Sequence, residues 1–480
     1  MRKKLPPGPA DLPVLGSVVP WLHDQPRFLL ETYRRYGDVV RFHFLGFRGA
    51  ILHGAEANRY ILVDAVENFL VAPVIDRARA RWIVGEGVLF IDNPAHRQQR
   101  RLIMPSMHRK RIEAYQQVMR EVSTQILDRW TPGVEIDIAS EMDDLALIIE
   151  GRTLFSMDFS GAEHELSDSV TVVTQTMNDA FRLALAQLPF DLPGIGYGGS
   201  VRRAIARVKA ILGEIIAEHE REGTDAGDVV SMLIAARDEE GERLSPAQIL
   251  DHLLTLFVAG HETLANALTW ACYLLAQHPA VTSKLLSELN QQLGGQPPTP
   301  ADLERLPYLE QVVKEVLRLY PPAASLSRIV REPFEWKGYC FAAGNIIMYS
   351  PYVSHRMPEQ FPEPEVFRPE RFDPAGGETH APYAFIPFGA GSRSCIGAPF
   401  AMMELKTVLA MLLQRFRLDL VAGQRVEATV RTTLQPKYGL SMRPQVQDGH
   451  TERSPAWVHG TRYQSGEAIL MNMLLKSVSK

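Results

Sequence analysis

One thiol stands inside a glycine-rich stretch near the C-terminal end of this chain. The stretch runs from Phe388 to Gly397 and reads F-G-A-G-S-R-S-C-I-G. Its cysteine, Cys395, comes just before residues 398–415, whose pattern predicts a helix. The first turn of a helix carries unpaired N–H groups and the positive end of the macrodipole, and both favour a thiolate. We therefore expect Cys395 to be a ligand rather than a structural cysteine.

The residues around Cys395 indicate what it could hold. Arg393 offers a permanent cation to a carboxylate, and Phe388 provides an aromatic shield. The glycines of the stretch allow positive φ angles and a close approach of the backbone to a flat, bulky group. This set suits a haem held through an axial sulfur better than zinc, which takes about three or four protein ligands.

A second chemical pattern lies in the middle of a long apolar segment. Ser245-Pro246 starts a helix there, and no helix-breaking residue follows for about thirty residues. The helix is nearly apolar on all sides, so it should be buried. Residues 259–263 within it read A-G-H-E-T. Thr263 can hydrogen-bond back to a carbonyl, and burying Glu262 is costly unless the carboxylate is used or paired.

Both patterns resemble those of the cytochrome P450 family. Residues 388–397 match its haem-binding signature, F-x-x-G-x-R-x-C-x-G, and residues 259–263 match its oxygen-activation segment, A-G-x-[DE]-T. The resemblance covers about residues 5–444 and is to the bacterial members that lack a membrane anchor. It implies haem b with Cys395 as the proximal iron ligand, O2 as co-substrate, and monooxygenation as the net reaction. The residues that it makes catalytic are Glu262 and Thr263.

The resemblance also implies which residues hold the cofactor. His96 and Arg100 lie four apart on one face of a helix predicted from Pro94, so they can reach the same anionic group. In the family an arginine at the position of Arg100 pairs with a haem propionate, and His96 stands where a tryptophan is frequent. Arg328 matches a position that contacts the other propionate. The implied cofactor-binding set is His96, Arg100, Arg328, Phe388, Arg393, Cys395 and Gly397.

A further motif concerns support of the cysteine loop. Glu315 and Arg318 are three apart on one face of a helix predicted over residues 307–319. In the family this E-x-x-R pairs with an arginine further on, and the candidate is Arg371. We expect these three residues to form a buried structural network.

Substrate contacts are also implied by position in the family. Most of the candidates are small or apolar, which favours a hydrophobic molecule such as a terpenoid, a fatty acid or a polyketide-like metabolite of secondary metabolism, to be hydroxylated or epoxidised. The candidates are Val88, Phe90, Thr255, Val258, Ala259, Ala324, Leu326 and Leu434.

Composition limits the class of protein. The chain has 480 residues and a formal charge of −5, which argues against general nucleic-acid binding. Its three cysteines are far apart and predict no disulfide framework, which fits a reduced, cytoplasmic compartment. Residues 1–21 start basic and turn proline-rich, so we expect neither a signal peptide nor a membrane anchor. We expect a monomer.

The predicted fold is mainly α with a small β-rich lobe, and its long central helix lies over the haem. Residues 38–53 predict a hairpin, and residues 426–442 predict a closing hairpin with Thr433, Leu434 and Gln435 at its tip. We expect a catalytic domain over residues 1–444 and a C-terminal extension of unknown role over residues 445–480.

The sequence also bears on the electron donor and on other possible functions. No flavin or nicotinamide domain fits beside the haem domain, so a separate ferredoxin and ferredoxin reductase should deliver electrons. Basic residues near residues 97–111 form either solvated helix faces or a docking patch for an acidic donor. Two other functions stay open: a haem-thiolate peroxygenase or isomerase, and a non-enzymatic haem-binding protein.

Overall fold

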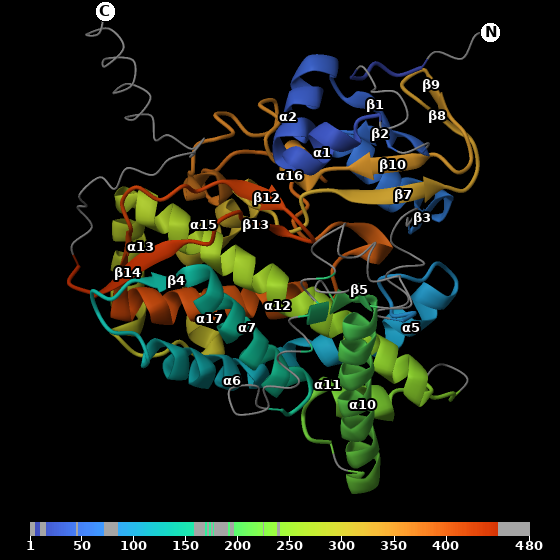
Figure 1. Cartoon of the computed structure of the whole chain (residues 1–480). Coiled ribbons are helices and arrows are strands. Elements are labelled where there is room, and N and C mark those ends of the chain that lie inside the picture. The colour runs from blue at the N-terminus through green and yellow to red at the C-terminus, as the bar shows by residue number, and fades with distance from the viewer. Residues whose placement is uncertain are drawn as a thin grey trace, which may run out of the picture.

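A computed structural model shows a mostly helical body with a smaller β-rich lobe beside it (Figure 1), as the sequence predicts. The structure describes residues 5–9, 16–44, 47–71, 85–157, 169, 172–173, 176, 191–192, 196–223, 225–237 and 241–449. Most of the predicted C-terminal extension, residues 450–480, lies outside the described residues.

The lobe is built on a five-stranded sheet with the strand order β1-β2-β10-β7-β3. Strands β1 and β2 form the predicted hairpin, with Val39 opposite Leu52, and β10 joins β2 in parallel. A separate three-stranded sheet has the order β11-β14-β4. The strands are β1 (Val39–Phe44), β2 (Phe47–Leu52), β3 (Phe69–Val71), β4 (Ile136–Asp137), β5 (Asp191–Leu192), β6 (Gly196–Tyr197), β7 (Leu326–Val330), β8 (Phe334–Trp336), β9 (Tyr339–Phe341), β10 (Ile346–Tyr349), β11 (Phe416–Leu420), β12 (Ala428–Val430), β13 (Leu434–Pro436) and β14 (Ser441–Val446).

The helical body is organised around α12, which crosses it in Figure 1. Its most extensive helix contacts join segments far apart in the sequence, α12 with α7 and α17 with α6. The helices are α1 (Val18–His23), α2 (Gln25–Tyr36), α3 (Ala55–Arg59), α5 (Ala95–Ile103), α6 (Arg109–Leu127), α7 (Ile138–Leu154), α10 (Gly198–Glu222), α11 (Val229–Ala235), α12 (Pro246–Gln277), α13 (Pro279–Leu293), α14 (Pro300–Glu304), α15 (Pro307–Leu319), α16 (Pro351–Ser354) and α17 (Ala398–Arg415).

The start of α12 follows the predicted chemistry. The Ser245 hydroxyl accepts the N–H of Gln248, and the Gln248 side chain accepts the N–H of Ser245, which together form a capping box. Pro246 occupies the first helical position, where a missing N–H costs nothing. The helix then runs for 32 residues, which is about 48 Å.

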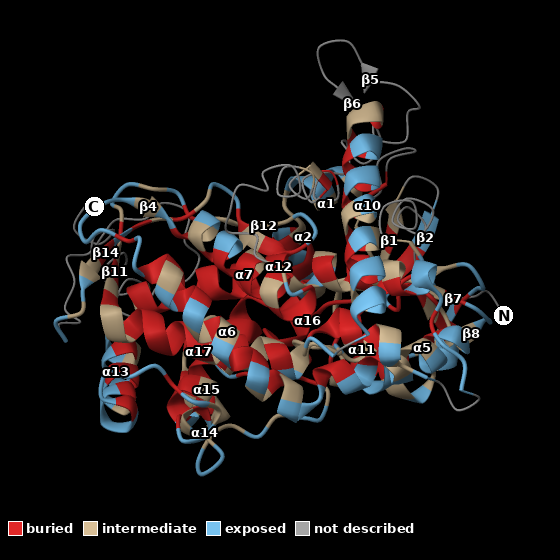
Figure 2. Cartoon of the chain, turned by 90° about the horizontal axis from the view of Figure 1, so that it is seen from below, coloured by how far each residue is buried: buried red, intermediate tan, exposed pale blue. Residues whose placement is uncertain are grey.

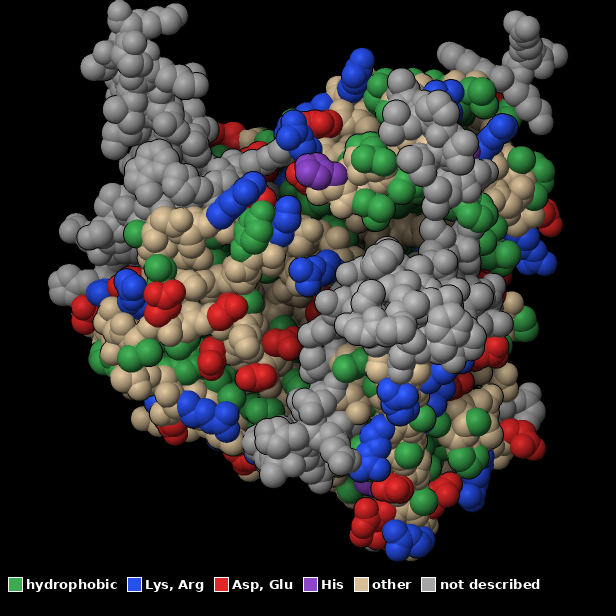
Figure 3. Space-filling model, viewed as in Figure 1, with side chains coloured by type: hydrophobic (Ala, Val, Ile, Leu, Met, Phe, Trp, Pro, Cys, Tyr) green, Lys and Arg blue, Asp and Glu red, His purple; other side chains and the backbone are tan. Residues whose placement is uncertain are grey.

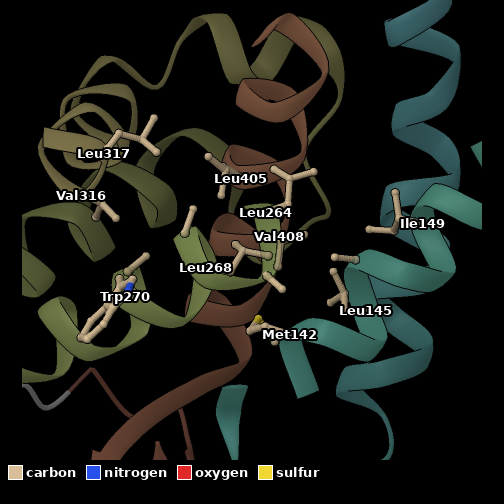
Figure 4. Packing of buried hydrophobic residues seen from close by; sticks show 14 of the residues in the cluster. Met142, Leu145, Ile149, Leu264, Leu268, Trp270, Val316, Leu317, Leu405 and Val408 are labelled. Carbon is tan, nitrogen blue, oxygen red and sulfur yellow. The ribbon is translucent and has the colours of Figure 1, made fainter. Parts of the chain in front are cut away.

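The main core lies where α7, α12 and α17 meet. Figure 2 shows these helices largely buried. In Figure 4, Leu145 and Ile149 of α7 face Leu264 of α12, with Leu405 and Val408 of α17 close by. This apolar contact fixes α12 against α17, the helix that begins three residues after Cys395.

The closing hairpin differs from the prediction. Its turn is residues 431–433, so Leu434 and Gln435 belong to β13 rather than to the tip. Ser441 begins β14, which leaves this hairpin and pairs with β11 instead. The change of direction comes at Gly439, whose φ of +73° is open to glycine at little cost.

Candidate active site

The cysteine stretch folds into a closed loop. The Cys395 N–H donates to the Phe388 carbonyl over 2.8 Å, which joins the two ends of the signature. Gly391 has a φ of +66°, and a Cβ atom there would lie 2.2 Å from the Leu62 carbonyl oxygen. Only glycine fits that position. Gly397 does not use the freedom for a positive φ that glycine has, because it is the N-cap of α17 with a φ of −80°.

The thiol of Cys395 is accessible to solvent although protein surrounds it. Burial raises the pKa of this thiol, whereas the N–H groups of Gly397 and Ala398 and the Arg100 guanidinium act to lower it. The helix start therefore favours the thiolate as predicted, but in the protein alone burial is the larger effect. A bound metal cation reverses that balance, because a coordinating thiol is deprotonated.

Three arginines from different elements gather near His96. Burial and the charges of Arg393, Arg100 and Arg328 together lower the pKa of His96 to about 4, against the opposing effect of Asp92. The His96 ring is buried, and its Nδ1 has no hydrogen-bond partner among the described residues. Three guanidinium groups and one carboxylate thus lie near His96, so this region can accept additional negative charge.

Each arginine is held by a local contact. The Arg100 guanidinium donates to the Ser394 carbonyl over 2.7 Å, which ties α5 to the cysteine loop. Arg393 donates to the Ile91 carbonyl over 3.0 Å. Arg328 donates to the Ser327 carbonyl over 2.8 Å and lies over the Tyr349 ring. Fixed donors of this kind lose little conformational freedom when an anion binds.

One face of α12 is accessible although the helix is otherwise buried. We call it the accessible stripe: Leu256, Ala259, Gly260 and Thr263, which recur at helical spacing. Ala259 is exposed to solvent, and the other three residues are partly exposed. The Thr263 hydroxyl donates back to the Ala259 carbonyl over 2.9 Å and to the Gly260 carbonyl over 3.0 Å. The predicted back-bonding is therefore present, while α12 stays helical through this segment.

Glu262 faces away from the accessible stripe. Its carboxylate is buried and accepts the Thr433 hydroxyl over 2.7 Å. Gln435 also donates to this carboxylate, over 3.4 Å. Asn266 completes the contact by donating to the Thr433 hydroxyl over 2.9 Å. The two predicted catalytic residues thus lie on different sides of α12 in this structure.

The predicted pocket residues fall into two groups. Residues with accessible surface could contact a substrate without rearrangement, and these are Phe90, Val258, Ala259 and Leu326. The others are buried against protein, namely Val88, Thr255, Ala324 and Leu434.

The loop that carries Val88 is fixed to α12 by a contact that the sequence did not reveal. The Glu86 N–H donates to the Asp251 carboxylate over 2.8 Å. A Cβ atom at Gly87 would lie 1.8 Å from the Thr255 hydroxyl oxygen, so loop and helix meet without space for a side chain. The close approach of the loop backbone at residues 86–87 to α12 therefore positions the pocket loop.

The structural network expected from the E-x-x-R motif is present. Arg318 donates to both oxygens of Glu315, over 2.7 and 2.8 Å, and Arg371 donates to Glu315 over 3.0 Å. The side chains of these three residues have no exposed surface. The structure therefore brings together the residues that the motif predicts to pair.

His355 connects that network to the cysteine loop, and sequence reasoning missed it. The Ile386 N–H donates to His355 Nε2 over 2.9 Å, so Nε2 is unprotonated and Nδ1 faces the Arg318 carbonyl at 3.2 Å. Burial and the charge of Arg318 lower its pKa to about 3, which keeps the ring neutral. No spacing pattern links His355 to Arg318, because their contact depends on the chain folding back.

The basic residues near α5 and α6 are partly paired. Arg97 lies 3.1 Å from Glu67, and Arg109 lies 2.7 Å from Glu113. Arg111 pairs with Asp225. Figure 3 likewise shows basic and acidic side chains interspersed over the face it displays. Ion pairs of exposed residues exchange easily, so both the solvated-face and the docking alternatives stay open.

Comparison with known proteins identifies the family. The sequence model of cytochrome P450 matches residues 6–445. The chain belongs to the cytochrome P450 family. This cytochrome P450 is 34% identical to cyclooctatin synthase of Streptomyces melanosporofaciens, over 89% of this chain and 92% of the relative. It is 30% identical to pentalenene oxygenase of Streptomyces avermitilis, over 91% of this chain and 96% of the relative.

A solved structure agrees with the fold. Cyanobacterial CYP120A1 with retinoic acid bound superimposes with a TM-score of 0.83 and 28% identity, over 93% of this chain and all of that one. The family match and the named relatives therefore identify the chain as a P450 monooxygenase, a class of enzyme that depends on haem. Among the described residues, no helix is both long and apolar enough to cross a membrane.

The residues present fit a haem. The accessible thiol of Cys395, with two backbone N–H groups beside it, could ligate the iron. Arg100, Arg328 and Arg393 supply the excess positive charge that two propionates need. The unpartnered Nδ1 of His96 adds a further polar contact in the same place.

Proposed function

We propose that this P450 hydroxylates or epoxidises a hydrophobic isoprenoid, with haem b and O2. The observation that carries the proposal is the accessible stripe, whose Leu256, Ala259 and Gly260 present only apolar or backbone surface. Such a surface favours a ligand held by shape and burial rather than by hydrogen bonds. The names of three relatives point to terpenoid substrates, since they mention cyclooctatin, cyclooctat-9-en-7-ol and pentalenene.

The cofactor would be held from several elements. Cys395 would ligate the iron, while Arg100, Arg328, Arg393 and His96 would bind the propionates. When bound, haem supplies the oxygen activation and the oxidation of a C–H or C=C bond, helped by electron donation from the thiolate. The backbone N–H groups of Gly397 and Ala398 would temper that donation by hydrogen-bonding the sulfur.

Helix α12 would position the substrate and supply a proton-donating hydroxyl. Thr263 is the hydroxyl of the accessible stripe, and its back-bond to Gly260 holds the oxygen lone pairs toward that face. In this role the Thr263 hydroxyl would donate a proton on the accessible face of α12. Glu262 would join only after leaving Thr433, whose hydroxyl it accepts over 2.7 Å.

Partners and location complete the proposal. We propose a ferredoxin and its reductase as electron donors, a monomeric enzyme, and a cytoplasmic location. Arg101 and Lys110 belong to the basic cluster near the cysteine side and are candidates for donor docking. Charge-dependent docking predicts that the electron-transfer rate falls as ionic strength rises.

The first test is the absorption spectrum of the dithionite-reduced protein with carbon monoxide. We expect a strongly red-shifted Soret band that Cys395→Ser loses. A Soret band unchanged in Cys395→Ser, or no haem band, would overturn the assignment. Cys340→Ser is the matched control, because Cys340 is an exposed cysteine in β9.

The second test concerns the substrate class. Pentalenene, retinoic acid and a saturated fatty acid are titrated into the ferric enzyme, and the spin-state shift is recorded. We expect an isoprenoid to shift the spin state at lower concentration than the fatty acid does. The opposite order would move the proposal to a fatty-acid substrate.

Product formed with peroxide alone, at the rate seen with ferredoxin, would favour a peroxygenase.

A further inference from the structure

Helix α12 has a polar face beside the accessible stripe. We define this polar face by Glu262, Asn266 and Trp270, which are spaced four residues apart and therefore share one side of the helix. All three side chains are buried, with exposed fractions of 6%, 8% and 1%. Burying polar groups is costly unless they are paired, so the polar face needs a partner.

The partner of the polar face is the β12–β13 hairpin. The Glu262 carboxylate accepts the Thr433 hydroxyl over 2.7 Å, and the Asn266 amide donates to the same hydroxyl oxygen over 2.9 Å. The Trp270 N–H donates to the Leu434 carbonyl over 2.9 Å. A carboxylate accepts a stronger hydrogen bond than a neutral group does, so the bond to Glu262 should be the strongest of the three.

The hairpin in turn holds a segment that carries predicted pocket residues. The Leu434 N–H donates to the Pro322 carbonyl over 2.9 Å. Ala324 and Leu326, two of the pocket candidates, follow within four residues of Pro322. Leu326 begins β7 and keeps accessible surface. The hairpin therefore joins α12 to this part of the pocket wall.

The hairpin also contacts the β-rich lobe. Strand β12 contacts α2, which packs on β1 of that lobe, while β13 contacts α12. Figure 1 shows β12 and β13 between α12 and α2. Gln25 at the start of α2 donates to the Ser325 hydroxyl over 2.8 Å. The hairpin, α2 and the segment around Ser325 thus form one wall, and the polar face of α12 holds that wall from one side.

Glu262 can affect the wall without changing the accessible stripe. Consecutive residues of a helix project about 100° apart. Thr263 therefore lies on the stripe while Glu262 points to the hairpin. A substitution at Glu262 removes a contact of the hairpin and leaves the small residues of the stripe in place.

We infer that Glu262 is a positioning residue for the substrate pocket, because its carboxylate holds Thr433 and, through it, the wall that includes Ala324 and Leu326. Ligand affinity then depends on the fraction of molecules whose hairpin is docked on α12, since only these present a complete wall. No proton or electron moves in this role, which is separate from any part of Glu262 in oxygen activation. The inference rests on the proposed function, because it takes this pocket to be the substrate site.

The direct test is the spin-state titration of the ferric enzyme, with whichever of pentalenene or retinoic acid shifts the spin state. The titration measures binding before electrons or oxygen are supplied, so a residue that only moved protons would leave it unchanged. We expect Glu262→Leu to weaken binding roughly tenfold, as when loss of this bond leaves the hairpin docked in about a tenth of the molecules. Glu262→Gln should recover most of the affinity, because its amide oxygen can still accept the Thr433 hydroxyl.

A second variant tests the same contact from the hairpin. Thr433→Val removes the hydroxyl and should weaken binding as Glu262→Leu does. The double variant should bind no more weakly than either single variant, because both substitutions remove one shared contact. Thr269→Val is the matched control, since Thr269 is a buried α12 threonine whose hydroxyl donates to the Ala265 carbonyl of its own helix over 2.7 Å. This control should bind the probe as wild type does.

The carbon monoxide spectrum of each variant shows whether haem and thiolate are intact. If Glu262→Leu does not hold haem, Thr433→Val and Asn266→Leu still test the contact, because both remove a bond of the Thr433 hydroxyl. Wild-type affinity in those two variants would then overturn the inference.

The outcomes separate this inference from the proposed function. Wild-type affinity in Glu262→Leu, equal losses in Glu262→Gln and Glu262→Leu, or losses that multiply in the double variant would each overturn the inference. Less product per electron pair at wild-type affinity would also overturn it, because Glu262 would then act in oxygen activation alone. A failed Cys395→Ser test would instead remove the monooxygenase function itself.

Discussion

At the scale of single residues, the cysteine loop depends on a network of buried charged groups whose hydrogen-bonding groups all have partners. Arg318 donates to Glu315 and to the carbonyls of His355, Pro364 and Val366. His355 in turn accepts the Ile386 N–H, two residues before the signature begins at Phe388. Such a network stabilises only as long as every member keeps its partner.

We predict that Glu315→Gln is strongly destabilising. The substitution leaves the Arg318 guanidinium buried without a countercharge and leaves Arg371 paired only with Glu378. Removing one partner of a buried ion pair costs about 3–5 kcal/mol in comparable cases. Urea unfolding followed by circular dichroism measures the change. Glu135→Gln is the control, because Glu135 pairs with Arg443 at the surface, where one pair contributes under about 1 kcal/mol. Equal effects of the two variants would contradict the prediction.

At the scale of elements, α12 holds two other segments in place. Asp251 and Thr255 fix the loop of residues 85–90, and Glu262 and Trp270 fix β13. The Trp270 N–H donates to the Leu434 carbonyl over 2.9 Å. One long buried helix thus sets the positions of the pocket loop and of the hairpin together.

We predict that Gly87→Ala moves the pocket loop. Its Cβ atom would lie 1.8 Å from the Thr255 hydroxyl oxygen and 2.6 Å from the Asp251 carbonyl oxygen, so the loop must shift away from α12. Overpacking of this kind costs about 1–3 kcal/mol. The spin-state titration should show weaker binding of the isoprenoid probe. Gly213→Ala in α10, where an added Cβ atom has nothing within 4 Å, should bind it as wild type does.

We also predict that Thr433→Val loosens the hairpin. The substitution removes a hydroxyl that donates to Glu262 and accepts from Asn266, and both partners are buried. Leaving buried polar groups unsatisfied costs about 1–3 kcal/mol. Thermal unfolding measures the loss, and Thr429→Val on the neighbouring strand β12 should change the midpoint less. The reverse order would contradict the prediction.

At the scale of the whole molecule, buried histidines limit stability in acid. Burial lowers the pKa of His53 to about 3 and of His252 to about 4, and His355 is lowered to about 3. A depressed pKa means that the folded state prefers the neutral ring. The stability from these rings is therefore complete above the unfolded pKa of 6.5 and is lost as the pH falls below it.

We predict that these histidines lower the free energy of unfolding between pH 6.5 and pH 4.5, a window set by their pKa values. The buried carboxyls of Glu150 and Glu404 oppose this fall, because burial raises their pKa and the folded state then binds the proton more tightly. Each histidine contributes a slope of about 1.4 kcal/mol per pH unit. His252→Gln should reduce the slope when unfolding is followed by denaturant titration at several pH values. His23→Gln should not, because His23 lies at the surface end of α1. A slope unchanged in His252→Gln would contradict the prediction.

Much of this protein could be predicted from local pattern. Spacing alone placed Cys395 at a helix start, gave α12 its length, and paired Glu315 with Arg318, because these features depend on residues within a few turns of one another. The small β-rich lobe beside a helical body also followed from periodicity and the family resemblance. Here local chemistry and global fold agree.

Only the tertiary structure decided which distant groups meet. The contact of Glu150 with Gly260, the bond from Ile386 to His355, and the turn of Glu262 toward Thr433 all join segments far apart in sequence. Their cause is the packing of apolar faces, which orients each helix about its axis and carries the polar side chains with it. A pattern of residue types specifies which face of α12 is buried, but the neighbours in the core decide what each side chain on that face contacts.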